Sequence, residues 1–209
     1  MEKKKFSVKT VALTGVMAAL VFVSLNVSFP IPLVPGTAPT RIHIGNAVIL
    51  LAGFLLGGKR GGLAAGIGAF FFDAVNPAYV QDALHTFVAR FLMAFICGAI
   101  AHAKYKGDSR NADNLGLNII GAVTASLFYV VQYLISKFLQ VLTAQQGFWQ
   151  SASYVLSGRL TNATGLSTAL AATGTAAIAS SINAVFGIAA SVALCVVIKK
   201  AMIKANVTL

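Results

Sequence analysis

Charged side chains are scarce in this sequence. Only 10% of the 209 residues are Asp, Glu, Lys or Arg, whereas soluble domains carry about 25%. Hydrophobic residues make up 57% of the chain, and its mean hydropathy is +0.82. So few charges cannot cover the water-facing surface of a soluble domain of this length, and lipid must replace water over most of it. The composition therefore predicts an integral membrane protein.

Cysteines are few, and the usual catalytic motifs are missing. The two cysteines, Cys97 and Cys195, lie in separate apolar runs, which is typical of packing residues rather than of a disulfide framework. The three histidines do not have the spacing of a metal triad. The glycine-rich stretch 57–68 lacks the Gly-Lys-Ser/Thr ending of a phosphate-binding loop. The sequence predicts no metal, no cofactor and no enzyme activity.

Positive charge predominates, with a net charge of +11, but its distribution argues against nucleic-acid binding. Twelve of the 16 basic residues fall in clusters between apolar runs, as the positive-inside rule requires of cytoplasmic segments. This asymmetry predicts an even number of membrane crossings with both termini in the cytoplasm. The clusters are Lys3, Lys4, Lys5 and Lys9, then Lys59 and Arg60, then Lys104, Lys106 and Arg110, and finally Lys199, Lys200 and Lys204.

Six apolar segments approach the length of about 20 residues that a spanning helix needs. They predict an all-α, six-helix protein forming one membrane domain over residues 1–209, in the cytoplasmic membrane of a bacterium. The second and third segments are short and closely spaced, so they form either a helical hairpin or a re-entrant pair. The first exceeds the roughly 7–15 apolar residues of a secretory signal and is expected to remain uncleaved. The segments are Val8–Asn26, Ile44–Gly57, Gly61–Val75, Leu84–Ala103, Leu115–Leu142 and Ala176–Ile198.

Two of the outward connections have unusual compositions. Residues 27–43 contain four prolines, which predicts a stiff, extended segment. Residues 143–175 form a long Ser-, Thr-, Ala- and Gly-rich connection. Loops of that length are usually functional or disordered. We expect this one to fold onto the helices as a lid containing short helices.

Polar and ionisable residues gather at the predicted outer end, above inner helix halves that are mostly aliphatic, alanine or glycine. Ionisable residues at membrane depth are functional candidates by default, and this one-sided distribution favours an outward-facing binding pocket over a pore. The competing interpretation is that these side chains snorkel to the interface. The candidate binding residues are Arg41, His43, Asp73, His85, Arg90, Gln132, Tyr133, Lys137, Trp149 and Asn183.

A family resemblance is visible in the first half of the chain. The run RIHIGNAVILLAGFLLGGKRGGLAAGIGA at residues 41–69, followed by Phe72-Asp73-Ala74 and by the segment 86–94, resembles substrate-binding S components of energy-coupling factor (ECF) transporters. The resemblance is good over residues 8–106 and extends further only in hydropathy and length. It rests on a short second helix, a glycine turn and an acidic end to the third helix.

The resemblance implies a six-helix subunit that binds a vitamin from outside the cell. Such subunits dock onto a transmembrane coupling protein and two cytoplasmic ATPases, which supply the energy. Family members present small residues on the first helix to the coupling protein. The matching positions here are Thr14, Gly15, Ala18 and Ala19, although glycine replaces the usual first alanine.

The ligand stays open at this point. Nickel and cobalt subunits carry an early histidine that this chain lacks. Arg90 with Lys137 suits a carboxylate, so pantothenate is the first expectation. Pyridoxine or hydroxymethylpyrimidine would suit the tyrosines, and riboflavin, folate and cobalamin also remain. The alternative function is a stand-alone ion-coupled transporter, which would need a polar path through the inner half and usually an internal repeat.

Overall fold

In the computed structural model, residues 8–31, 40–103, 114–145, 147–158 and 164–205 are described, with residues 30, 31, 40–42 and 164 described by their backbone alone. The elements in chain order are α1 (Val8–Asn26), β1 (Ser28–Ile31), β2 (Thr40–His43), α2 (Gly45–Ala74), the 3-10 helix η1 (Val80–Asp82), α3 (Ala83–Ala101), α4 (Leu115–Thr143), α5 (Phe148–Leu156) and α6 (Thr164–Lys204).

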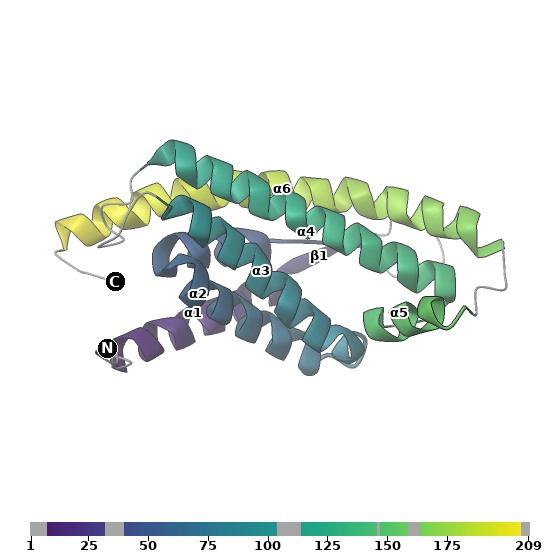
Figure 1. Ribbon diagram of the computed structural model, residues 1–209. Helices are drawn as coiled ribbons and strands as arrows, with labels where there is room; N and C mark the ends of the chain where they lie inside the picture. Colours follow the sequence, from purple (N-terminus) through teal and green to yellow (C-terminus); the bar gives the residue numbers. More distant parts are fainter. Residues whose placement is uncertain (1–7, 32–39, 104–113, 146, 159–163, 206–209) are drawn as a thin grey trace.

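The long helices lie side by side along one direction (Figure 1). The start of α1 and the end of α6 are at one end of the molecule, while η1 and α5 are at the other. Five described helices are long and apolar enough to cross a membrane, with α2 counted once. The helices bury a continuous apolar core between them, so the fold is that of a helical membrane protein.

The interruption of α2 at Gly57 determines how the first half of the chain packs. Its φ of 76° and ψ of 174° lie in a region that is open essentially only to glycine. Before this residue, Leu50 lies beside Cys97 and Phe54 beside His102. Residue numbers increase in the same direction along the two helices, so the first arm of α2 runs parallel to α3.

The second arm of α2 runs antiparallel to α3, with glycines of one helix facing phenylalanines of the other. Because glycine has no side chain, the two backbones approach closely, as is common between membrane helices. Gly58, Gly62 and Gly66 face Phe95, Phe91 and Phe87, and a Cβ on each glycine would lie 2.9, 3.0 and 3.1 Å from the facing carbonyl oxygen. The chain therefore reverses at Gly57, and the two short helices expected at 44–57 and 61–75 are arms of one hairpin.

The fold is helical as expected, and the connection between α1 and α2 adds one short two-stranded antiparallel sheet to the part of the chain that the structure describes. Ser28 pairs with His43, and the register continues to Ile31 and Thr40. The proline content favours extended backbone here. Both strands of this sheet are edge strands. Pro30 is tolerated in such a strand, because the absence of its backbone N–H need not remove a hydrogen bond between the strands.

The loop expected over residues 143–175 is mostly helical, which corrects that prediction. α5 occupies part of it, and α6 begins at Thr164 and continues for 41 residues, or about 61 Å at 1.5 Å per residue. Alanine has the highest helix propensity, and the threonine hydroxyls bond within the helix. Thr173 donates to the carbonyl of Ala169 at 2.7 Å, and Thr175 to that of Ala172 at 2.9 Å.

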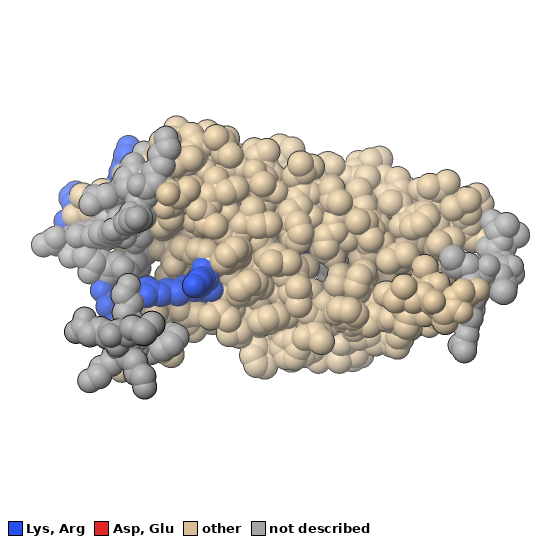
Figure 2. Space-filling view, in the orientation of Figure 1, with Lys and Arg blue, Asp and Glu red and all other residues tan. Residues whose placement is uncertain are grey.

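Basic side chains on the face seen in Figure 2 gather at the end of the molecule where α1 begins and α6 ends. The exposed basic residues of these segments are Lys9 at the start of α1, Lys59 and Arg60 next to Gly57, and Lys200 and Lys204 at the end of α6. The rest of that face is without Lys, Arg, Asp or Glu among the residues described. The two ends of the bundle therefore differ in charge.

We predict that Gly57→Ala destabilises the protein by about 1–3 kcal/mol, because alanine would be held in a backbone conformation that L-residues rarely adopt. Thermal unfolding in detergent measures the effect. Gly174→Ala is the matched control, since Gly174 is helical and has open space around it, so this variant should be neutral or slightly more stable. Equal midpoints for both variants would contradict the hairpin geometry at Gly57.

Candidate functional site

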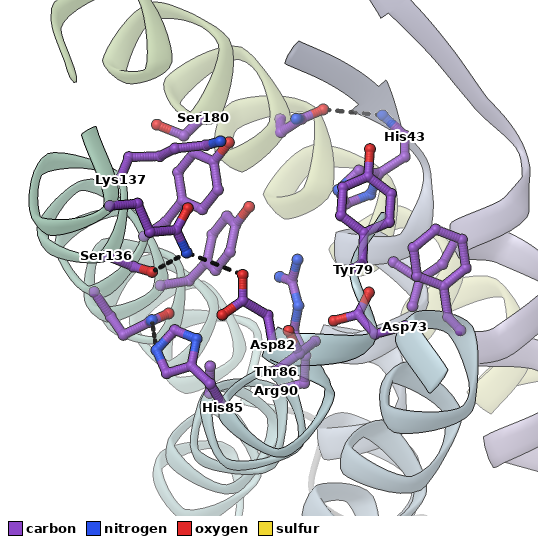
Figure 3. A pocket seen from close by; sticks show the side chains of 18 residues that line it. His43, Asp73, Tyr79, Asp82, His85, Thr86, Arg90, Ser136, Lys137 and Ser180 are labelled. Atoms are coloured by element: carbon purple, nitrogen blue, oxygen red, sulfur yellow. Dashed lines mark hydrogen bonds between the residues drawn. The ribbon is translucent and has the colours of Figure 1, made fainter. Parts of the chain in front are cut away.

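A cavity of about 190 Å³ lies between the helices towards the end of the molecule opposite the basic residues. Side chains from both halves of the chain converge on it (Figure 3). The lining residues are Leu25, His43, Phe72, Asp73, Tyr79, Asp82, His85, Thr86, Ala89, Arg90, Tyr129, Gln132, Tyr133, Ser136, Lys137, Gln140, Ser180 and Asn183. Most are polar or aromatic, so the cavity is a candidate site for a solute with polar groups.

Arg90 of α3 is the most buried basic residue among those that line the cavity. Its side chain is 8% exposed, and Nη1 donates to Oδ1 of Asn46 at 2.8 Å. The guanidinium carbon lies 4.1 Å from the centroid of the Tyr129 ring, which is a cation–π contact. These contacts hold the guanidinium in one place while leaving it on the cavity wall.

Asp73, at the end of the second arm of α2, stands near Arg90. Its carboxylate accepts a hydrogen bond from the Thr86 hydroxyl and interacts electrostatically with Arg90. Thr86 and Arg90 lie four residues apart on α3 and so share a face of that helix. α2 and α3 thus place opposite charges on the same wall.

Asp82 joins three elements at the mouth of the cavity. Oδ1 accepts from the backbone N–H of Phe148 at 2.7 Å, and Oδ2 accepts from Nε2 of Gln140 at 2.9 Å. Asp82 also interacts with Lys137 electrostatically. One carboxylate from η1 therefore connects α4 with the first residue of α5.

His85 forms a second contact with the start of α5. Its ring stacks on that of Phe148, with centroids 4.1 Å apart and planes 15° apart. Nε2 of His85 lies 2.6 Å from Nε2 of Gln132, and the tautomer decides which atom donates. The first residue of α5 is thus fixed against the rim by a hydrogen bond and a ring stack.

Aromatic rings stand on two sides of the cavity. On α4, Tyr129 and Tyr133 stack with centroids 5.9 Å apart. Phe72 of α2 stacks on Tyr79 with centroids 6.4 Å apart. Flat apolar faces among donors and acceptors suit a ligand that has a ring with polar substituents.

The cavity includes most of the candidate residues predicted from the sequence. His43, Asp73, His85, Arg90, Gln132, Tyr133, Lys137 and Asn183 all line it. The side chain of Arg41 lies outside the described part of the structure. Trp149 is 53% exposed on α5 and is not among the lining residues, so its predicted place in the pocket is not supported. A ring on the exposed face of a short amphipathic helix gives the same sequence signal as a ring in a site.

Several lining residues were not among the candidates. Tyr79 and Asp82 precede α3, while Tyr129, Ser136 and Gln140 share a face of α4. Asp82 and Tyr129 could have been predicted from the sequence. Asp82 is acidic, Tyr129 is aromatic, and both lie close in sequence to predicted site residues. Thr86 and Ser136 carried little, since hydroxyls within apolar helices usually bond to their own backbone.

The end of the bundle opposite the cavity is less apolar than the sequence suggested. Asn118 and Ser126 of α4 and Ser191 of α6 are buried. The Ser191 hydroxyl donates to the carbonyl of Ile188 at 3.1 Å. Oδ1 of Asn118 and Oγ of Ser126 have no hydrogen-bond partner among the described residues. These residues are exceptions to the mostly aliphatic, alanine and glycine composition expected for the inner halves of the helices.

The small residues predicted as a partner interface on α1 do not share one environment. Gly15 and Ala19 are exposed, and Thr14 is half-buried, with its hydroxyl donating to Thr10 at 2.9 Å. Ala18 is buried, 7% exposed, with its backbone against Gly68 of α2. Of the four residues, Ala18 is therefore engaged within the protein itself.

A cavity lined by polar and aromatic side chains within a bundle of membrane helices indicates the class of protein: a multi-pass membrane protein that binds a small solute. The family described as "ECF-type riboflavin transporter, S component" matches residues 5–164, which is most of the chain, and the chain belongs to that family. It is therefore the substrate-specific subunit of a vitamin-type ECF importer, a non-enzymatic component that associates with the ECF module. No curated protein matches the chain.

We predict that Asp82→Ala releases the start of α5. The amide of Phe148 loses its charged acceptor, and hydrogen bonds to charged groups contribute about 1.5–3 kcal/mol. Hydrogen–deuterium exchange should therefore become about ten- to a hundredfold faster in Phe148–Leu156. Ser153→Ala is the control, because Ser153 is exposed and bonds only within α5. Unchanged exchange in Asp82→Ala would show that other contacts hold α5.

Proposed function

We propose that this subunit captures its vitamin from outside the cell, in the cavity that contains Arg90. The observation that carries the proposal is that the basic residues and the cavity lie at opposite ends of the bundle. Exposed basic residues occupy the end where α1 begins, and the cavity lies towards the other end. Basic residues mark the cytoplasmic side of membrane proteins, so both termini face the cytoplasm and the cavity opens outward.

The hairpin within α2 supports six membrane crossings in place of five. Its arms, 45–56 and 58–74, are about 18 and 26 Å long at 1.5 Å per residue, which is shorter than the hydrocarbon core of about 30 Å. A short arm is tolerated where protein rather than lipid surrounds it. The first arm is buried almost throughout, from Gly45 to Leu55, so its ends need not reach the lipid surface.

The ligand we propose is a flat, uncharged heteroaromatic vitamin with hydrogen-bonding substituents. The pairs Tyr129–Tyr133 and Phe72–Tyr79 offer ring faces. Around them, two carboxylates balance the charges of Arg90 and Lys137, so the lining does not strongly favour a ligand of either sign. The carboxylates are those of Asp73 and Asp82.

Riboflavin, pyridoxine and hydroxymethylpyrimidine all have this chemistry. The name of the family supports riboflavin. The cavity volume of about 190 Å³ supports the one-ring compounds, because pockets for drug-sized ligands hold about 300–1,000 Å³. All three are therefore primary probes for binding.

Pantothenate is the second candidate, and one observation favours it. The guanidinium of Arg90 is fixed on the cavity wall, and guanidinium groups bind carboxylates bidentately. Asp73 lies close enough to Arg90 to offset this attraction. For that reason pantothenate, the first expectation from the sequence, ranks below the uncharged ring compounds.

We predict that the purified subunit binds one of these vitamins in detergent without ATP and without sodium or a proton gradient. Arg90→Met should weaken binding by about 1.5–3 kcal/mol, because a hydrogen bond from a charged group is lost. Titration calorimetry with riboflavin, pyridoxine, hydroxymethylpyrimidine and pantothenate measures the affinity of the wild type and of Arg90→Met. Lys200→Met, which removes an exposed charge at the opposite end, is the control. A requirement for sodium would favour the ion-coupled alternative, and unchanged affinity in Arg90→Met would remove that residue from the site.

The partners we propose are a transmembrane coupling protein and two cytoplasmic ATPases, contacted partly through α1. Gly15 and Ala19 lie four residues apart and are exposed, so they share one face of the helix. A face of small residues lets a second helix approach closely. Ala18 is not part of this face, since it is buried against α2.

We expect Gly15→Leu and Ala19→Leu to weaken assembly with the ECF module by about 1–3 kcal/mol, the range for overpacking a close contact. Ligand affinity of the isolated subunit should not change, since neither residue lines the cavity. Co-purification with the coupling protein measures assembly. Ala193→Leu, an exposed alanine on α6, is the control, and equal co-purification of all variants would exclude this face.

A further inference from the structure

Asn46 is a polar side chain that the cavity does not explain. It lies in the first turn of α2, is 0% exposed and is not a lining residue. Its Oδ1 accepts from Arg90 at 2.8 Å, whereas its Nδ2 has no hydrogen-bond partner among the described residues. A buried amide whose amino group has no hydrogen-bond partner is unfavourable for stability. Its position is therefore better explained by its hydrogen bond with Arg90.

Two contacts together define the orientation of the Arg90 guanidinium. The ring of Tyr129 lies beneath its central carbon at 4.1 Å, which fixes its height above α4. The hydrogen bond from Nη1 to Asn46 prevents rotation over that ring. A guanidinium carries five N–H donors in one plane. Because Nη1 also donates to Sδ of Met93 at 3.8 Å, the N–H groups bonded to neither Asn46 nor Met93 are the ones that can face a ligand in the cavity.

The neighbouring backbone leaves Asn46 little room to move. On α6, a Cβ added to Gly187 would lie 3.0 Å from Cβ of Asn46 and 3.5 Å from the backbone N of Ala47. α6 and α2 therefore meet directly at this point. Their contact confines the Asn46 side chain to the place where it meets Arg90.

We propose that Asn46 is a positioning residue for ligand selection. By holding the guanidinium in one orientation, it directs N–H donors of Arg90 at an acceptor atom of the ligand. In a heteroaromatic vitamin this atom is a ring nitrogen, a ring carbonyl oxygen or a hydroxyl oxygen, and in an acid it is a carboxylate oxygen. The inference rests on the proposed function, because it assigns Arg90 to the ligand. It adds a residue beneath the cavity that determines which acceptors are bound.

The test compares Asn46→Leu, which has similar size and no acceptor, with Asn46→Asp, which keeps one. Probes are riboflavin, pyridoxine, hydroxymethylpyrimidine and pantothenate, measured by titration calorimetry. Asn46→Leu should weaken the best-bound probe at least tenfold, and Asn46→Asp should restore affinity for an uncharged probe to within about threefold of the wild type. Asn118→Leu, another buried asparagine outside the cavity, is the matched control.

The action through Arg90 has its own signature. In an Arg90→Met background, adding Asn46→Leu should not change affinity further. A further tenfold loss would overturn the proposal, and so would equal losses in Asn46→Leu and Asn118→Leu. Should Asn46→Leu fail to fold, Asn46→Ala carries the same expectations.

A readout without ligand separates this inference from the proposed function. If none of the four probes binds the wild-type protein, the proposed ligand class is wrong, yet the Asn46–Arg90 coupling remains measurable. The thermal midpoints of Asn46→Leu, Arg90→Met and the double variant then decide. We expect the double variant to unfold within about 1 °C of Arg90→Met, and fully additive losses would refute the positioning role.

Discussion

A guanidinium buried in an apolar bundle needs polar partners from several directions, because an unpaired buried charge is strongly destabilising. The hairpin in α2 supplies two of them. By reversing at Gly57, the chain brings Asn46 near its start and Asp73 near its end to the same residue, Arg90. Residues 27 positions apart in the sequence thus meet around one side chain, and the cavity forms where they meet.

The hairpin in turn depends on close approach between backbones. Three glycines of the second arm face three phenylalanines of α3, whose rings stack along the helix with centroids 6.3 and 5.9 Å apart. Larger side chains in place of the glycines would push the arm away from α3. Asp73 would then leave the wall that it shares with Arg90 and Thr86, so the glycines of an apolar contact support a polar site.

The sequence predicted the long apolar helices well, because lipid imposes a strong and regular constraint on composition. α1 covers the residues expected for the first helix, and α4 differs by a single residue at its end. The extension of α6 to Thr164 was missed, since a hydropathy threshold does not detect helix among alanine and threonine residues. The strands of the proline-rich segment depend on pairing between Ser28 and His43, which composition alone does not encode.

The site was predictable to the extent that a charge at membrane depth must have a partner or a purpose. Arg90, Asp73 and Lys137 were predicted in this way, and all three line the cavity. Asn46 was not predicted, because a single amide at the start of an apolar run is usually a residue of the helix terminus and gives no sign of a site. Its role depends on Arg90, 44 residues away, and that contact exists only once the hairpin has formed. Trp149 was predicted as a site residue, but it is exposed and does not line the cavity. An exposed aromatic residue and a ring in a site have the same sequence signal.

The length of α6 has a structural consequence. The helix runs without interruption from Asn183 on the cavity wall to Lys204 at the basic end, a span of about 31 Å at 1.5 Å per residue. One unbroken element therefore joins the wall of the cavity directly to the charged end of the subunit, with no loop between them.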